Sequence, residues 1–124
     1  MLVADIFAII TGSLTLIRLI DETCGFYKEC RDLRTRCYAV QKILSDNQSV
    51  LSDHDGLKDL MDVIDHAIKY LTNRRNKWFI RDPISEKLFF LRIAKYESRI
   101  DSWIITVTLS LTVTPRNSMN TDPR

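Results

Sequence analysis

The chain has 124 residues, of which 45% are hydrophobic and 27% charged, with a formal net charge of +2. This composition is typical of one globular domain whose core needs no disulfide staples, and it excludes a long disordered chain. Only three glycines and three prolines are present, which favours long helices and few turns. The three cysteines form no C-x-x-C pair, which speaks against a disulfide framework or a zinc site and favours a reducing compartment.

The first segment, residues 2–23, is predicted to be a helix that is apolar on nearly every side. Asp5 and Arg18 are the only charged residues among the first twenty, and the uncharged run between them is shorter than the roughly 20 residues that span a bilayer. Because no basic leader or cleavage site precedes the run, we expect a cytoplasmic resting form. Ala4, Ala8 and Gly12 recur at i, i+4 and i+8, a small-residue stripe that permits close helix contacts in lipid. We therefore expect this helix either to be buried in a core or to insert into a membrane and oligomerise through the stripe.

Three further helices are predicted from apolar residues that recur at intervals of three and four. The second spans residues 25–46, with Thr23 as a candidate N-cap and loop residues at Ser45–Ser49. Its seam is Phe26, Cys30, Leu33, Cys37, Val40 and Leu44. The third spans residues 57–76, with a stripe of Leu57, Leu60, Met61, Ile64, Ala67, Ile68 and Leu71.

The fourth helix is predicted over residues 84–112, with Pro83 in its first turn. Its seam is Phe89, Ile93, Tyr96, Ile100, Trp103, Val107 and Leu111. The stretch from Trp103 to Thr114 is rich in β-branched residues and also alternates as a strand does, but a lone strand would have no partner, so we favour a helix. The expected fold class is all-α: an antiparallel four-helix bundle over residues 1–114 with an unusually apolar first helix. Residues 115–124 are expected to be a disordered tail or a linker to a missing C-terminal module.

No motif for catalysis or metal binding is found. The two histidines, His54 and His66, accompany no recognisable nucleophile, and no glycine-rich phosphate loop is present, so we expect neither an enzyme nor a cofactor. The acidic turn at residues 53–56 fails as a calcium loop because Leu51 occupies the first ligand position, and no metal is expected. Cys30 and Cys37 on the seam are interpreted as small core residues, whereas Cys24 near a turn is better placed for a redox or palmitoylation role.

The charges are unevenly distributed along the chain. Residues 46–65 carry six acids and one base, and residues 74–99 carry eight bases and three acids. The cluster at residues 74–81 also holds Trp78 and Phe79, and aromatic rings among cations are typical of an interfacial lipid anchor. Ten residues are therefore candidates for lipid binding: Lys28, Arg31, Arg74, Arg75, Lys77, Trp78, Arg81, Arg92, Lys95 and Arg99. The alternatives are a solvated helix face and rings packed over a bundle end; nucleic acid is an unlikely partner because no nucleic-acid module is present.

The chain also resembles the N-terminal four-helix bundles of mixed-lineage kinase domain-like proteins and the fungal HeLo-like (HELL) cell-death domains. The resemblance covers about residues 5–112. It is carried by three stretches: IIT at residues 9–11, KECRDL at residues 28–33 with Arg36 after it, and KLFFLRIAKYESRIDSW at residues 87–103. The small-residue stripe is more similar to the fungal members, whereas the first helix lacks the basic residues of the animal ones.

The resemblance implies an executioner of regulated, necroptosis-like cell death. Such domains rest as cytoplasmic bundles, self-associate when an upstream signalling protein or kinase module acts, bind anionic phospholipids and permeabilise the plasma membrane. The apolar first helix favours insertion over a purely electrostatic mechanism. The alternative reading is a helical adaptor bundle whose oppositely charged segments mediate homotypic or other protein contacts without membrane activity.

Overall fold

The computed structural model describes residues 2–51, 56–76 and 83–120, and the side chains of residues 6–51, 56–75 and 83–112 within them. The helices are α1 (Leu2–Thr23), α2 (Lys28–Asp46), α3 (Gln48–Leu51), α4 (Leu57–Asn76) and α5 (Pro83–Asn120). No strand occurs in these ranges, so the all-α fold class is confirmed, as is the helical state of residues 103–114.

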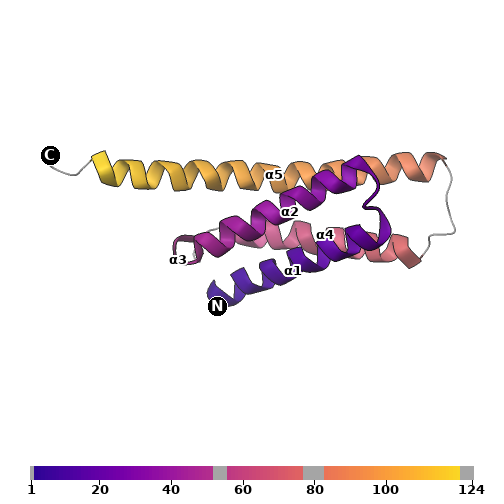
Figure 1. Ribbon diagram of the computed structural model, residues 1–124, viewed down its shortest axis with the longest axis horizontal. Helices are drawn as coiled ribbons and strands as arrows, with labels where there is room; N and C mark the ends of the chain where they lie inside the picture. The colour runs from indigo at the N-terminus through magenta and orange to yellow at the C-terminus, as the bar shows by residue number, and fades with distance from the viewer. Residues whose placement is uncertain (1, 52–55, 77–82, 121–124) are drawn as a thin grey trace.

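The core lies between the four long helices. α1 and α5 each pack against both α2 and α4. α5 is the longest helix and extends past the others toward the C-terminus (Figure 1). The predicted seams supply the core: in α2, Cys30, Leu33, Cys37, Val40 and Leu44 are all buried. In α5 the seam is buried from Phe89 to Val107, and Leu111 is half-buried.

One face of α1 is buried and the opposite face is not. Its buried residues include Ile6, Ile9, Leu16 and Ile20, and the Oγ of buried Ser13 donates a hydrogen bond of 2.8 Å to the Ile9 carbonyl. Phe7 and Leu14 are exposed on the other side, together with Ala8, Thr11 and Arg18. The solvent side of α1 is therefore mixed, with two large apolar side chains among polar ones, where an ordinary surface helix is mostly polar. No helix in the described part of the chain is long and apolar enough to cross a bilayer.

Four details of the helix boundaries differ from the sequence prediction, although α1 and α2 end where they were expected to. Thr23 is not an N-cap: it belongs to α1, where its Oγ1 donates to the Leu19 carbonyl at 2.6 Å. α2 begins at Lys28 after an extended Tyr27, which leaves Phe26 outside the helix and 66% exposed rather than on the seam.

The other two differences lie further along the chain. The predicted loop at residues 45–49 is mostly helical, because α2 runs to Asp46 and the single turn of α3 then buries Leu51 against the core. α5 continues beyond Thr112 through Pro115 to Asn120, although a proline inside a helix removes one backbone hydrogen bond.

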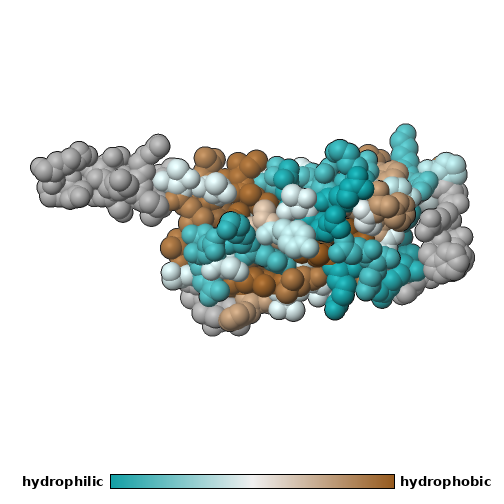
Figure 2. Space-filling view, viewed as in Figure 1, coloured by the Kyte–Doolittle hydropathy of each residue, from teal (hydrophilic) through white to brown (hydrophobic). Residues whose placement is uncertain are grey.

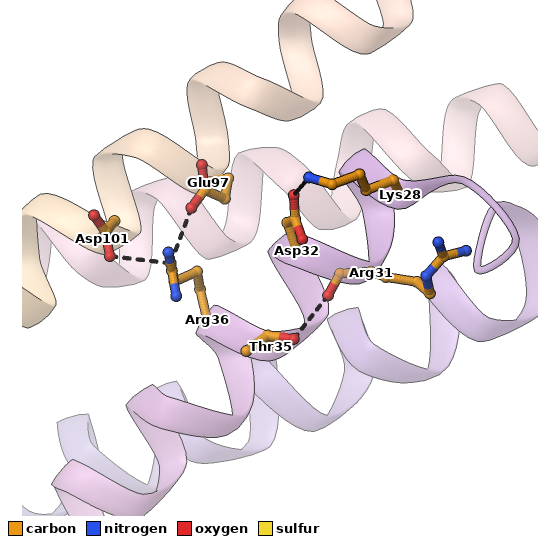
Figure 3. Close-up of polar contacts among 7 residues, drawn as sticks. All are labelled: Lys28, Arg31, Asp32, Thr35, Arg36, Glu97 and Asp101. Carbon is orange, nitrogen blue, oxygen red and sulfur yellow. Dashed lines mark hydrogen bonds and ion pairs between the residues drawn. The ribbon is translucent and has the colours of Figure 1, made fainter.

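Ion pairs and hydrogen bonds join the helices outside the core. The Nε of Arg36 on α2 lies 2.9 Å from Glu97 Oε2 and 3.0 Å from Asp101 Oδ1 of α5, and so bridges the two helices (Figure 3). Arg34 pairs with Asp21, and Arg75 pairs with Glu22 at 3.2 Å. These contacts tie α1 to α2 and to α4 at the end of the molecule where the candidate site lies.

Candidate lipid-binding surface

One end of the molecule collects cations from three separate segments. It is formed by the α1–α2 connection, the C-terminal turn of α4 and the first turns of α5 (Figure 1). Residues 18–34, 74–75 and 83–92, which make up this end, carry eight Lys or Arg and five Asp or Glu. We call six of its residues the basic end: Phe26, Lys28, Arg31, Arg74, Arg75 and Arg92.

An aromatic cluster holds these segments together. Tyr27 contacts Phe90 edge-on, with ring centroids 4.8 Å apart, and lies 6.1 Å from Phe89. Tyr70 of α4 stacks on Phe89 at 6.0 Å. The Tyr27 hydroxyl donates a hydrogen bond of 2.8 Å to the Glu86 carboxylate, which fixes the α1–α2 connection against α5. The rings form a rigid apolar base because aromatic side chains bury large areas and prefer such geometries.

Two arginines of the basic end lie on these rings rather than on carboxylates. The guanidinium carbon of Arg74 lies 3.9 Å from the centroid of the Phe89 ring, and that of Arg92 lies 5.4 Å from the centroid of Tyr70. Cation–π contacts hold a guanidinium in place without neutralising its charge. Burial raises the pKa of Tyr70, so its ring carries no opposing charge near neutral pH.

The other three cations have polar partners. Lys28 pairs with Asp32 at 2.9 Å, an exposed i, i+4 contact on α2 (Figure 3). Arg75 pairs with Glu22, and both side chains are about half exposed. Arg31 donates to the Phe26 carbonyl at 2.7 Å, and this partner is uncharged. Exposed ion pairs of this kind contribute at most about 1 kcal/mol, so they hold these cations only weakly.

Phe26 is the residue of this surface that sequence reasoning missed. Its position at the start of a heptad pattern assigned it to the core, yet it is exposed beside Lys28 and Arg31. The signal was present in Gly25, two residues after the predicted end of the first helix, because a glycine there favours a connection rather than a helical turn. An exposed ring flanked by cations is the arrangement that anchors proteins at the headgroup level of a bilayer.

The remaining predicted lipid-binding residues are divided between another surface and the undescribed segment. Lys95 and Arg99 are exposed further along α5, and neither forms an ion pair with a described residue. Lys77, Trp78 and Arg81 lie outside the described residues. The acidic turn at residues 53–55, with His54, lies outside them as well.

The small-residue stripe does not form one exposed face. Gly12 is buried against α4, where a Cβ would lie 3.1 Å from Cγ2 of Ile64 and 3.4 Å from Cε of Met61. Ala8 is exposed, and the side chain of Ala4 lies outside those described. In this conformation Gly12 serves the contact between α1 and α4 within one chain.

The cysteines are all buried as free thiols. A hydrogen bond from Cys30 lowers the pKa of Cys24, and the same bond together with burial raises the pKa of Cys30. Burial alone raises the pKa of Cys37 to about 12. Within the described ranges, no three side chains of His, Cys, Asp or Glu come together as a metal site.

No family model matches this chain, and neither a curated protein nor a solved structure matches it.

Proposed function

We propose that this chain is a membrane-targeting domain that binds anionic phospholipids and permeabilises the bilayer in regulated, necroptosis-like cell death. The observation that carries the proposal is exposed Phe26, whose ring lies 4.3 Å from that of Tyr27 in the aromatic cluster and whose carbonyl accepts from Arg31. The sequence resemblance to HeLo-like and mixed-lineage kinase domain-like bundles supports the same function. The proposal takes the four long helices as an antiparallel bundle that is cytoplasmic at rest and reaches the plasma membrane when activated.

The electrostatic part of this binding is moderate. Each cation near an anionic surface contributes about 1 kcal/mol, and the attraction falls off within a Debye length. Arg31, Arg74 and Arg92 have no carboxylate on their guanidinium groups in the described part of the chain. Together they supply about 3 kcal/mol, and the Phe26 ring adds the apolar contact that fixes depth.

Permeabilisation requires more than docking, and α1 is the segment we propose to insert. Its core face includes six large aliphatic side chains: Ile6, Ile9, Leu16, Ile17, Leu19 and Ile20. Removing them from the core costs about 1.5–3 kcal/mol each, on the order of 10 kcal/mol in total. A bilayer offsets this cost because it offers the same side chains an apolar environment, and exposed Phe7 and Leu14 are already available to enter it first. Release of α1 would also free Gly12 and complete the stripe for oligomerisation.

The test is dye release from phosphatidylcholine vesicles with and without phosphatidylserine. We expect release to require phosphatidylserine and to fall on the order of fivefold per removed charge in Arg31→Gln/Arg92→Gln, because both side chains are exposed and have no carboxylate partner among the described residues. The matched control is Lys42→Gln/Lys58→Gln, which removes the same charge from exposed lysines elsewhere. Equal release by the two double variants would place the binding outside the basic end. No release from anionic vesicles by the unmodified chain would refute membrane activity and favour the adaptor reading.

A further inference from the structure

α5 carries a second heptad pattern, on the face opposite the core. Its positions alternate in spacing by four and three residues, as those of the buried seam do. All nine are exposed: Ile84, Leu88, Leu91, Lys95, Ser98, Ser102, Ile105, Leu109 and Thr112. The five aliphatic members are between 53% and 73% exposed, although a solvated helix face is normally polar. Figure 2 shows hydrophobic side chains on the surface of α5 next to its C-terminal segment.

The order of residues along this outer seam is nearly symmetric. Three aliphatic residues precede the polar middle of Lys95, Ser98 and Ser102, two aliphatic residues follow it, and Thr112 ends the seam. A seam whose two halves are alike is self-complementary when a second copy is turned end to end, as a two-fold interface requires. We propose that the outer seam of α5 is a homodimerisation surface on which two copies of this chain pair antiparallel.

The polar middle selects the direction of pairing. In a parallel pair Lys95 would face Lys95 of the second copy inside the seam, where two like charges repel each other. In the antiparallel register that joins Leu88 to Ile105 of the second copy, Ile84 meets Leu109 and Lys95 meets Ser98. Leu91 meets Ser102, the one layer that joins an aliphatic side chain to a serine. The small serines, which line a groove between α4 and α5, leave room for the lysine side chain.

The size of the surface predicts a weak dimer. The seam from Ile84 to Leu109 is about 38 Å long. A strip about 10 Å wide along it buries on the order of 800 Å² over both copies, below the size of a stable interface. A hollow lined by Tyr70, Leu88 and Leu91 adds a pocket for an aliphatic side chain of the second copy. The dimer is therefore concentration-dependent in solution.

Salt gives this interface a signature of its own. The antiparallel register places Arg92 beside Arg99 of the second copy, and both are exposed. Salt screens that repulsion, so the dimer becomes stronger as ionic strength rises. A dimer held by attraction between the acidic segment, residues 46–65, and the basic segment, residues 74–99, would instead become weaker as ionic strength rises. The inference is independent of the membrane proposal because the dimer forms without lipid.

Sedimentation equilibrium of the full chain, over a range of concentrations and without lipid, tests the proposal. We expect a monomer–dimer equilibrium that Leu88→Asp weakens roughly tenfold or more, because it places a charge in the Leu88–Ile105 layer, which the two-fold symmetry repeats. Tyr38→Asp is the matched control, because Tyr38 is an equally exposed hydrophobic residue on α2. A monomer at every concentration, or equal weakening by both variants, would overturn the surface.

Cysteine cross-linking tests the register. The double variant Leu88→Cys/Ile105→Cys is expected to give a covalent dimer under mild oxidation, while each single variant gives none. The native thiols do not interfere because all three are buried. Cross-linking of the single variants would show a parallel pair and overturn the antiparallel one, and a covalent dimer from neither the double nor the single variants would overturn pairing through this face.

Discussion

Arg36 is the position at which the link between α2 and α5 is most directly tested. Its Nε lies within 3.0 Å of both Glu97 and Asp101, from consecutive turns of α5 (Figure 3). The side chains of all three residues are between a quarter and two fifths exposed. The Arg36→Ala change removes the shared cation and leaves two neighbouring carboxylates facing each other across partly buried surface.

The magnitude follows from the geometry and the exposure. A hydrogen bond to a charged group contributes about 1.5–3 kcal/mol when buried, and an exposed ion pair about 0–1 kcal/mol. The partial exposure places this pair between these limits, at about 1–2 kcal/mol of the free energy of unfolding. In a domain of this size that loss lowers the melting temperature by roughly 4–8 °C.

Urea denaturation followed by circular dichroism measures the effect. Lys42→Ala is the control, because its pair with Asp46 at 3.3 Å is within one helix and both side chains are mostly exposed. We expect that control to change the free energy of unfolding by less than about 0.5 kcal/mol. If Arg36→Ala were no more costly than Lys42→Ala, the argument that Arg36 joins the two helices would be wrong. Coupling between Arg36→Ala and Glu97→Ala in a double-mutant cycle isolates the pair itself.

Three further predictions concern the core. Gly12→Val should cost about 1–3 kcal/mol of stability, since any Cβ there meets Ile64 at 3.1 Å; an unchanged urea midpoint would contradict this packing. Phe89→Ala should cost about 3–5 kcal/mol because the ring is fully buried and carries Arg74, and a loss below 1 kcal/mol by the same assay would refute its role. Burial raises the pKa of Cys37 to about 12 from 9.0, so its thiol ionises first in the unfolded chain. Cys37 should then contribute a fall in stability of about 1.4 kcal/mol per pH unit between these values, on top of the contribution of Cys30, and Cys37→Ala should make the slope shallower by that amount in urea titrations; equal slopes would contradict the shift.

The buried half of this fold was readable from the sequence because helical periodicity and burial are two aspects of one pattern. The buried residues of each helix are three or four positions apart, as in Leu33, Cys37 and Val40 of α2. This spacing places them on one face of the helix, which is the face that packs into the core. The same rule failed at Phe26, where the spacing fits but Gly25 and an extended Tyr27 start α2 later. Local turn geometry decided that position, and periodicity does not report it.

The candidate site was only partly predictable for a different reason. Clusters of Arg and Lys in the sequence indicated the basic stretch, but not which of these cations are paired with a carboxylate. That distinction depends on contacts between residues far apart in the chain, such as Arg75 with Glu22 and Arg74 with Phe89. The outer seam of α5 was present in the sequence too, but the spacing that identified the seam from Phe89 to Leu111 does not report what the opposite face contacts.

Binding of anionic bilayers through the basic end, with its exposed Phe26, is decided by co-sedimentation with phosphatidylcholine vesicles that contain or lack phosphatidylserine. The proteins to compare are the unmodified chain, Phe26→Ser and the control Tyr38→Ser. Both rings are exposed, so neither change should disturb the core. We expect binding that requires phosphatidylserine, is weakened by Phe26→Ser and is unaffected by Tyr38→Ser. Binding that is indifferent to Phe26, or absent on anionic vesicles, would contradict this expectation.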